Sequence, residues 1–481
     1  MFAAFSVQRR ERLGRRLAAA VLTSGLIAGG SIAGAAVAVA DEGPQHQGGA
    51  SATLTGLTTY DEAVLKINGK KRELPAGLFE MAVDGGGTLK TYCIDVHNPT
   101  QQKAKYLETS WDQTSLGHNE QAGKILWILK NSYPQVDDLA GLAKKAGAES
   151  LTKETAAAGT QVAIWRYSDG VDVEAVDPSA EKLADWLQAQ AQNLQEPKAS
   201  LVLEPNAVSG KAGGKLGPIT VRTNAERATV TAPDAAGVKV TDKDGKPVTE
   251  ATDGTELYVD VPAGTADGSA TFDVQASTSV SVGRAFASLS KSQTQILAGS
   301  SESTVSATGS ATWAKKGAIP ALTAEKNCAK GGVDVTAKNE GDEAFTFELA
   351  GQKHEVGAGE SKTVTVPVAE DQAYDFTIAL PGGETKTFKG VLDCKTSSDT
   401  TTPPTTGDDE PGSEPSPQSG GATSGGTTSG GTTGGDATGD LAETGASNAT
   451  PMIAGIAVAF VLLGGGAVFF HRKKKSAAAG Q

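Results

Sequence analysis

The sequence predicts a multidomain fold class: an α+β domain, two all-β immunoglobulin-like sandwich domains, a disordered stalk and one C-terminal transmembrane helix. A chain of 481 residues is long enough for several domains. Four of its five tryptophans and five of its seven tyrosines precede residue 200, which places a dense aromatic core in the first domain. After residue 200, short alternating segments separated by turn signals indicate β-sandwiches.

Residues 1–40 are predicted to be a signal peptide. Five arginines between residues 9 and 16 precede an apolar stretch over residues 17–39, and small residues stand before Asp41. This order of a basic start, an apolar run and a small-residue end is typical of a secretion signal. We therefore expect the mature chain to lie outside the cytoplasm.

Residues 51–200 carry both strand and helix patterns. Alternation over residues 89–96 predicts a strand. Helical spacing of apolar residues predicts helices over 120–130, 151–167 and 179–194. We therefore expect an α+β domain here.

Residues 201–316 are predicted to form an all-β spacer domain without a catalytic constellation. The Asp-Lys-Asp-Gly stretch at residues 242–245 lacks the closing glutamate of an EF-hand loop, so we expect a hairpin turn there. No spacing marks a Lys–Asn or Lys–Asp isopeptide pair in either β-domain, and such bonds remain open.

A third domain over residues 319–394 is predicted to be a β-sandwich closed by a disulfide. Cys328 opens it and Cys394 closes it, and a bond across a loop of this length contributes about 4 kcal/mol. The chain has three cysteines, so this pairing leaves Cys93 alone in the first domain. Exported proteins seldom keep an unpaired thiol without a structural or chemical reason.

The C-terminal segments predict a stalk and a membrane span. Residues 395–440 consist largely of Thr, Gly, Ser, Pro and Asp, a composition that cannot form a packed core. Residues 451–470 are apolar and long enough to cross a bilayer. The basic cluster at residues 471–475 would remain on the cytoplasmic side.

A pentapeptide immediately precedes this span; its residues are Leu441, Ala442, Glu443, Thr444 and Gly445. It resembles the sortase signal of Gram-positive surface proteins, with alanine in the usual place of proline, a form favoured in high-GC actinobacteria. The resemblance implies cleavage between Thr444 and Gly445 and attachment of Thr444 to peptidoglycan. Sortase and peptidoglycan are thus expected partners, and the span would retain the chain in the membrane only until sorting.

The net charge argues against nucleic acid as a partner. The whole chain carries −13, and the signal peptide and the segment beyond Thr444 each contribute +4, so about −21 remains on residues 41–444. Phosphate binding requires clustered lysine and arginine, whereas this surface is acidic.

Three interpretations of Cys93 compete. It is a buried structural thiol, as free cysteines often are; or it is a nucleophile assisted by His97 or His118; or it forms an internal thioester. His97 shares its strand face but lies roughly 13 Å away in extended chain, too far to accept the proton. His118 lies in a loop whose position the sequence does not give.

Two short motifs favour the thioester. The first contains Tyr92, Cys93 and Asp95, and the second contains Thr160, Gln161 and Ala163. Together they resemble the thioester (TQxA) domain of Gram-positive surface adhesins, over residues 51–200. The resemblance implies that Cys93 supplies the sulfur and Gln161 the acyl carbon. A second Thr-Gln dipeptide occurs at Thr294–Gln295.

The resemblance implies a function without turnover. A wall-anchored thioester would react once with an amine or hydroxyl of a surface protein or glycan, so we expect a non-enzyme acting in adhesion. The sequence indicates no cofactor or metal. The alternative is a structural wall or coat protein in which Cys93 is buried and inert.

Overall fold

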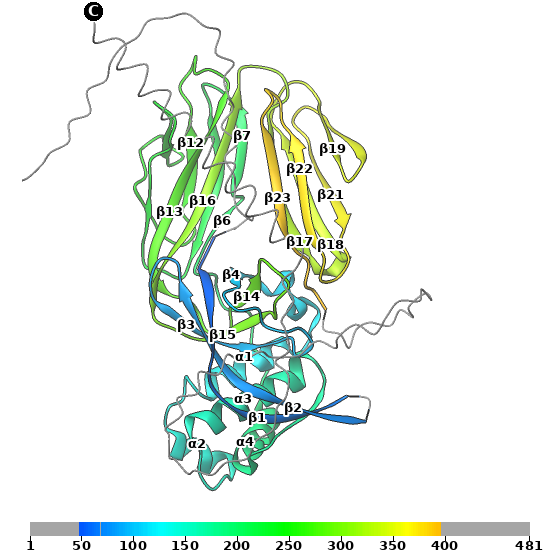
Figure 1. Cartoon of the computed structure of the whole chain (residues 1–481). Helices are drawn as coiled ribbons and strands as arrows, with labels where there is room; N and C mark the ends of the chain where they lie inside the picture. The colour runs from blue at the N-terminus through cyan, green and yellow to red at the C-terminus, as the bar shows by residue number, and fades with distance from the viewer. Residues whose placement is uncertain (1–47, 68, 396–481) are drawn as a thin grey trace, which may run out of the picture. The chain divides into compact units, whose positions relative to one another are not determined.

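The computed structural model describes residues 48–67 and 69–395 (Figure 1). The predicted signal peptide, the stalk from residue 396, the sortase motif and the span at 451–470 lie outside these residues. All described residues belong to the first of two units, residues 1–422. No helix in the described part of the chain combines the length and apolarity required to cross a membrane.

A seven-stranded sheet in the order β2-β3-β15-β14-β4-β1-β5 forms the scaffold of the first domain. Because β1 pairs with both β2 and β4, six of the strands close into a ring. The strands are β1 (Ser51–Ile67), β2 (Lys70–Val83), β3 (Thr88–Cys93), β4 (Lys105–Thr109), β5 (Asp172–Ala175), β14 (Ala285–Ser288) and β15 (Gln295–Ser300).

The origin of β14 and β15 corrects the predicted domain boundary. Both strands lie inside the 201–316 segment, which we expected to form a spacer by itself. Instead β14 pairs with β4, and β15 pairs with β3, so residues from about 281 to 300 complete the first sheet. Alternation identifies a strand but not its partner, and pairing between such distant segments leaves no local signal.

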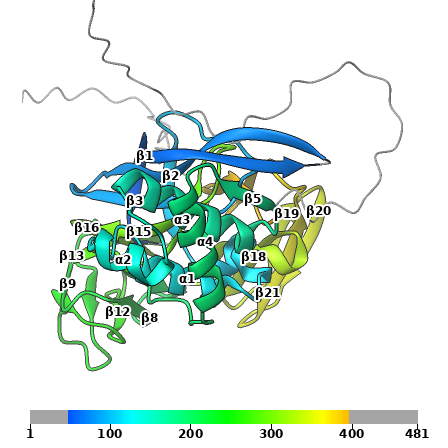
Figure 2. The same ribbon diagram turned by 90° about the horizontal axis from the view of Figure 1, so that it is seen from below.

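Four α-helices and two 3₁₀ turns belong to the same domain, and the α-helices gather together with β1 running along them (Figures 1 and 2). Their bounds are η1 (Trp111–Gln113), η2 (Ser115–His118), α1 (Ala122–Asn131), α2 (Leu139–Ala146), α3 (Lys153–Ser168) and α4 (Pro178–Gln190). The predicted helices correspond to α1, α3 and α4, while α2 was not predicted. Helix α4 starts with Asp177 as its cap and stops before residue 194, because Ala191 turns to ψ 130°.

Helix α3 is the central helix of the domain. It packs against β1, β2 and α4, and its residues 156–165 are all buried. Thr152 and Thr155 form a reciprocal capping box at its start. The small side chains before residue 160 permit close packing, so α3 carries Gln161 into the interior.

The second domain is a sandwich of a four-stranded sheet, β10-β12-β8-β6, and a five-stranded sheet, β11-β9-β13-β16-β7. The strands are β6 (Leu201–Glu204), β7 (Ala207–Lys211), β8 (Lys215–Thr223), β9 (Ala228–Val230), β10 (Lys239–Thr241), β11 (Glu250–Ala251), β12 (Glu256–Asp260), β13 (Gly268–Ser279) and β16 (Glu302–Ala314). The segment at 242–245 is a turn, in which Asp242 Oδ1 accepts from the amides of Asp244 and Lys246. β14 and β15 lie in the chain between β13 and β16, so this sandwich and the first sheet share one continuous segment.

The third domain has a core of its own, built from three small sheets: β17-β18-β21, β19-β20 and β22-β23. Their strands are β17 (Pro320–Asn327), β18 (Gly332–Asn339), β19 (Phe345–Leu349), β20 (Gln352–Val356), β21 (Ser361–Pro367), β22 (Ala373–Ala379) and β23 (Thr385–Val391), with η3 (Cys328–Lys330) after β17. The predicted disulfide between Cys328 and Cys394 is confirmed. Cys93 is a free, buried cysteine.

Candidate functional site

The structure brings Cys93 and Gln161 together. Cys93 is the last residue of β3, and Gln161 lies in the buried stretch of α3. The amide N–H of Cys93 donates to Gln161 Oε1 at 2.9 Å, and Gln161 Nε2 donates to the Cys93 carbonyl at 2.8 Å. Both side chains are 0% exposed. The two residues that the sequence motifs single out are therefore held by reciprocal hydrogen bonds.

The end of the β2–β3 pairing explains how the side chain of Gln161 reaches the backbone of Cys93. Pairing between β2 and β3 ends at Phe79 and Thr91, two residues before Cys93. The backbone groups of Cys93 are left without a strand partner on that side, and the carboxamide of Gln161 satisfies both of them. Buried backbone polar groups require such partners, so this contact stabilises the fold as well as positioning the carboxamide.

The groups around the Cys93 sulfur shift the pKa of its thiol in opposite directions. The amide of Asp95 donates to Sγ at 3.2 Å. Burial raises the pKa of the Cys93 thiol well above its ordinary value, and the carboxylates of Asp169 and Asp95 raise it further. The Trp165 indole and the Asp95 amide act in the opposite direction and lower the pKa. The resting thiol is therefore protonated at neutral pH.

Two buried carboxyl groups accompany the thiol. Burial raises the pKa of Asp95 well above its usual range, with Asp393 and Asp169 as the next causes. Burial likewise raises the pKa of Asp169 to about 7. Asp169 is fixed by the amide of Val96 at 2.9 Å and the hydroxyl of Ser168 at 2.6 Å. A carboxyl group with such a pKa exchanges protons readily near neutrality.

Asp169 is a site residue that the sequence reasoning missed. It follows α3 in an ordinary Ser-Asp-Gly stretch, which is typical of a helix end, so no sequence signal marks it. Only the fold brings it to the loop after Cys93.

The other predicted motif residues support the pair. Thr160 Oγ1 lies 2.6 Å from both the Ala156 carbonyl and the Ser132 hydroxyl, and these contacts fix this turn of α3. The Tyr92 hydroxyl donates to the Tyr133 carbonyl at 2.8 Å. Tyr92, Thr160 and Ala163 are all fully buried, so they exclude water from the pair.

Gln295, in the second Thr-Gln dipeptide, also lies beside Cys93. It is the cross-strand partner of Cys93 in the β3–β15 pairing, which places both side chains on one face of the sheet. Its Oε1 accepts from Thr91 Oγ1 at 3.0 Å, and its Nε2 has no hydrogen-bond partner in the described part of the chain. Gln295 is thus a second carboxamide near the thiol, without the backbone contacts that Gln161 makes.

The interpretation of Cys93 as a nucleophile assisted by histidine has no supporting hydrogen bond in the described part of the chain. Among the described residues, neither His97 nor His118 forms a hydrogen bond with Cys93. Burial lowers the pKa of His97, whose Nε2 has no hydrogen-bond partner in these residues. His118 lies in η2.

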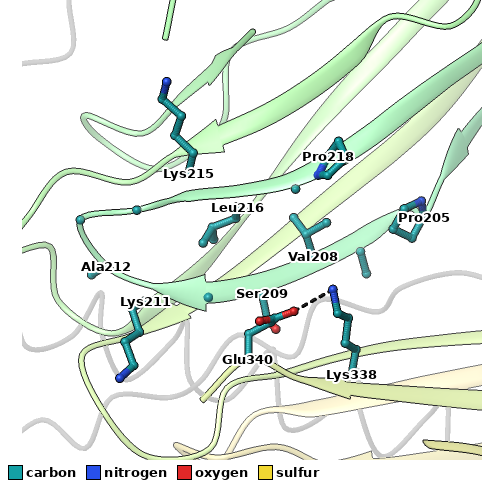
Figure 3. Close-up of a pocket in the computed structure, with 15 residues that line it drawn as sticks. Pro205, Val208, Ser209, Lys211, Ala212, Lys215, Leu216, Pro218, Lys338 and Glu340 are labelled. Carbon is teal, nitrogen blue, oxygen red and sulfur yellow. Dashed lines mark ion pairs between the residues drawn. The ribbon is translucent and has the colours of Figure 1, made fainter. Parts of the chain in front are cut away.

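A separate cavity of about 540 Å³ lies between the β7–β8 hairpin and the end of β18 (Figure 3). Its lining is mostly backbone and small side chains, with an ion pair of 2.7 Å between Lys338 and Glu340. The Ser209 hydroxyl in this lining already donates to the Ile319 carbonyl. This hydroxyl is therefore engaged with the backbone.

Comparison with known proteins points to the same segment. A sequence model of the thioester domain family matches residues 90–193, a range that contains both Cys93 and Gln161. A search of curated proteins finds no match.

Several solved structures are similar to parts of the chain. The Bacillus anthracis TIE protein is 14% identical, with 72% of this chain and 81% of that chain covered and a TM-score of 0.26. The thioester domain of the Enterococcus faecium TIE86 protein is 16% identical over 55% of this chain and 97% of that one, with a TM-score of 0.26. The thioester domain of the Staphylococcus aureus TIE protein is 12% identical over 55% and 98%, with a TM-score of 0.22. TM-scores this low carry no argument of their own.

Proposed function

We propose that Cys93 and Gln161 form an internal thioester, which the protein uses once to attach itself covalently to an external nucleophile. The observation that carries the proposal is the pair of reciprocal hydrogen bonds between the Gln161 carboxamide and the Cys93 backbone. These bonds hold the acyl carbon next to the residue that supplies the sulfur. Holding two reactants in this way provides a large effective molarity.

The reaction balances with the groups present. The Cys93 sulfur loses its proton and attacks Cδ of Gln161, forming a tetrahedral intermediate with negative charge on Oε1. The Cys93 N–H, already bonded to Oε1, stabilises that charge. The C–N bond then breaks, and Nε2 leaves as ammonia with the proton from the thiol. Asp169, with a pKa of about 7, is suited to relay this proton.

The surroundings of the pair would protect the product. A thioester open to water hydrolyses, whereas Cys93 and Gln161 are both 0% exposed. Trp165 and Tyr92 are fully buried beside them and contribute bulk that excludes water.

In use, an amine or hydroxyl would attack the acyl carbon of Gln161. An amide or ester forms, the C–S bond breaks, and the Cys93 thiol is released with a proton. The reaction ends there, so the protein is not an enzyme with turnover. The target would be a nucleophile of a surface protein or glycan on another cell or wall.

The predicted export and sorting signals support a place on the cell wall. We expect sortase to cleave between Thr444 and Gly445 and to join the chain to peptidoglycan. Thr444→Ala is expected to leave the protein in the membrane fraction, whereas Thr438→Ala, outside the motif, should remain wall-bound. Equal wall attachment of the two variants would contradict this part of the proposal.

A second candidate function rests on the burial of the thiol. A fully buried cysteine with a raised pKa also suits an inert core residue in a structural wall or coat protein. In that case the Gln161 carboxamide only completes the hydrogen bonding at the end of β3.

Intact mass separates the two functions. The thioester form should be lighter than the disulfide-bonded sequence by one ammonia, and methylamine should add at Gln161. Gln161→Ala and Cys93→Ala should abolish both changes. Gln295→Ala is the matched control, because it removes the neighbouring carboxamide and should leave both changes intact. An unshifted mass with a Cys93 that alkylates after unfolding would reject the thioester.

A further inference from the structure

Polar contacts join the third domain to the loop that follows Cys93. Asn98 Nδ2 donates to Asp371 Oδ1 at 3.3 Å, and the same amide group donates to Asp95 Oδ2 at 2.7 Å. Asp371 Oδ2 also lies 3.3 Å from Lys291 Nζ. The turn between β21 and β22, which carries Asp371, is thus bonded to a loop that begins directly after Cys93.

A second contact reaches the strand that pairs with Cys93. Thr294 Oγ1 donates to Asp393 Oδ2 at 2.6 Å, and the Thr294 carbonyl accepts from the amide of Ile94 at 3.1 Å. The next residue, Gln295, is the cross-strand partner of Cys93 in the β3–β15 pairing. The third domain therefore contacts both segments that flank the candidate thioester, the loop after β3 and the start of β15.

These segments enclose the pair of Cys93 and Gln161. Both side chains are 0% exposed. Residues 91–96 are all buried, and residues 97–99 are only partly exposed. An external nucleophile can therefore reach the acyl carbon only after part of this enclosure moves.

The third domain is the part that can move without disrupting a hydrophobic core. One core extends through residues 50–313 and joins the first domain to the second, whereas the third domain has a separate core within residues 322–388. Separate cores that meet through polar contacts are typical of domains that move relative to each other. Displacement of β3 or α3 would instead break the first core.

The closed interface leaves some polar groups poorly satisfied. Asp95 Oδ1 and His97 Nε2 are buried and have no hydrogen-bond partner in the part of the chain that the structure describes. Burial raises the pKa of Asp95 most, and the negative charges of Asp393, Asp169 and Asp371 raise it further. Water would satisfy these groups once the domains separate, so closure is stabilised only modestly.

The connection between the second and third domains provides a pivot. Residues 315–319 link β16 to β17, and Gly317 among them has a φ of 88°. Asp342 accepts from the Gly317 amide at 2.6 Å and pairs with Lys211 at 2.9 Å, which ties this connection to β7. At its far end β17 leads into η3, which contacts η1 and η2 of the first domain. A rotation about residues 315–319 would therefore lift the contacting end, and the cavity of about 540 Å³ beside Lys211 leaves room for it.

We propose that the third domain is a hinged lid over the candidate thioester site, held closed by the contacts of Asp371 and Asp393 and pivoting at residues 315–319. In the closed state the lid keeps external amines and hydroxyls away from Gln161. The rate of capture then depends on the fraction of molecules that are open. This chemical consequence rests on the proposed function, whereas the opening of the interface does not.

Lys291→Glu tests the lid in the full-length chain. The substitution places a carboxylate opposite Asp371, which shifts the equilibrium towards the open state. We expect methylamine to add at Gln161 roughly fivefold faster than in the parent, or more, measured by intact mass over time. Lys353→Glu is the matched control, because it makes the same change of charge at an exposed lysine of β20 and should react at the parental rate.

Amide hydrogen exchange follows the lid without the thioester. In a Cys93→Ser background no thioester forms, and Lys291→Glu should still accelerate exchange of residues 94–98 and 291–294, which the lid covers. Exchange within α3 should stay unchanged, because that helix lies in the first core. Circular dichroism of each variant establishes that it is folded.

Three results would overturn the lid. Faster exchange with an unchanged methylamine rate would show that the third domain moves without controlling access. Unchanged exchange in Lys291→Glu would show that these contacts do not hold the domains closed. Equal acceleration by Lys353→Glu would assign the effect to net charge. If the parent has not lost ammonia, the thioester itself is rejected, and hydrogen exchange alone then decides whether the interface opens.

Discussion

At the scale of single residues, the buried carboxylate of Glu108 connects three segments that are distant in the sequence. Its carboxylate accepts from the amides of Ala50 and Ser200 and from Nε of Arg284 at 2.9 Å, and it also bonds the Ser200 hydroxyl. Arg284 immediately precedes β14 and also pairs with Glu196. The side chains of Arg284 and Glu108 are 5% and 1% exposed, so their charges depend on each other.

Replacement of Glu108 should therefore be costly. Glu108→Gln keeps the shape and leaves Arg284 with a weakened counter-charge, and we expect a loss of about 3 kcal/mol in the free energy of unfolding, measured in urea. Glu204→Gln is the control, since its pair with Arg222 is exposed and should contribute less than about 1 kcal/mol. Similar losses of stability for the two variants would show that the buried Glu108–Arg284 pair contributes no more than an exposed ion pair.

The pKa of Asp169 predicts a pH dependence of stability. Its folded pKa of about 7 lies above the unfolded value of about 4, so the folded state holds the proton more tightly. The stability this provides is complete below pH 4 and is lost as the pH rises through 7.

Asp169→Asn removes that titration. Relative to the parent, the variant should gain stability steadily between pH 4 and 7.5, measured as the free energy of unfolding in EDTA. Asp172→Asn, at an exposed carboxylate on β5, is the control for the substitution itself. A parallel pH profile for Asp169→Asn and the parent would contradict the assignment.

At the scale of elements, the position of α3 against α4 decides where Gln161 lies. Gly159 stands two residues before Gln161, and a Cβ placed on it would come within 2.4 Å of the Ala180 carbonyl oxygen of α4. Real side chains never approach a backbone oxygen so closely, so the glycine is required by the helix–helix contact.

We expect Gly159→Ala to displace α3 and to lower stability by about 1–3 kcal/mol. Under the proposed function, the fraction of protein that has lost ammonia should fall as well, measured by intact mass. Gly268→Ala is a matched control, because its nearest neighbour would lie at 3.6 Å and the substitution should be tolerated. Normal thioester content in Gly159→Ala would show that thioester formation does not require the close contact of α3 with α4 at Gly159.

The insertion of β14 and β15 makes a further prediction about elements. A fragment of residues 48–200 lacks both strands, which leaves β3 and β4 unpaired on one side and removes Gln295 from beside Cys93. We expect this fragment to remain unfolded or to aggregate, whereas residues 48–316 should unfold cooperatively. Circular dichroism during thermal unfolding checks this, and cooperative unfolding of the shorter fragment would refute it.

At the scale of the whole molecule, the sequence predicts individual helices and strands, but it does not predict which strands pair when they are far apart in the chain. Helical spacing of apolar residues predicts α1 and α4, each of which buries one face, and α3 is predicted although it lies wholly in the core. The disulfide was predictable because Cys328 and Cys394 stand at the two ends of one predicted domain. The return of residues 285–300 to the first sheet has no such signature, since the alternation of a strand is the same whichever partner it takes.

Some residues of the candidate site were likewise predictable from the sequence, and others were not. Cys93 and Gln161 were predictable from short motifs. The structure shows why they meet: the pairing of β2 with β3 ends two residues before Cys93, so the Cys93 backbone is free to bond the Gln161 carboxamide. Asp169 and Asp393 were not predictable, because they reach the neighbourhood of Asp95 through turns that have no unusual composition. Burial is the main reason that the pKa of Asp95 is raised, and the charges of Asp393 and Asp169 raise it further.

The disulfide of the third domain also determines how the chain carries mechanical load. Tension applied between Ile319 and Lys395 would pass along β17 and across the bond from Cys328 to Cys394, because that is the shorter covalent route. Cys328 and Cys394 are 66 positions apart, and the 65 residues between them, roughly 230 Å of extended chain, would bear none of this tension. If the chain is pulled from both ends, this length therefore stays folded, and only a reducing environment would convert the domain from a rigid link into an extensible one.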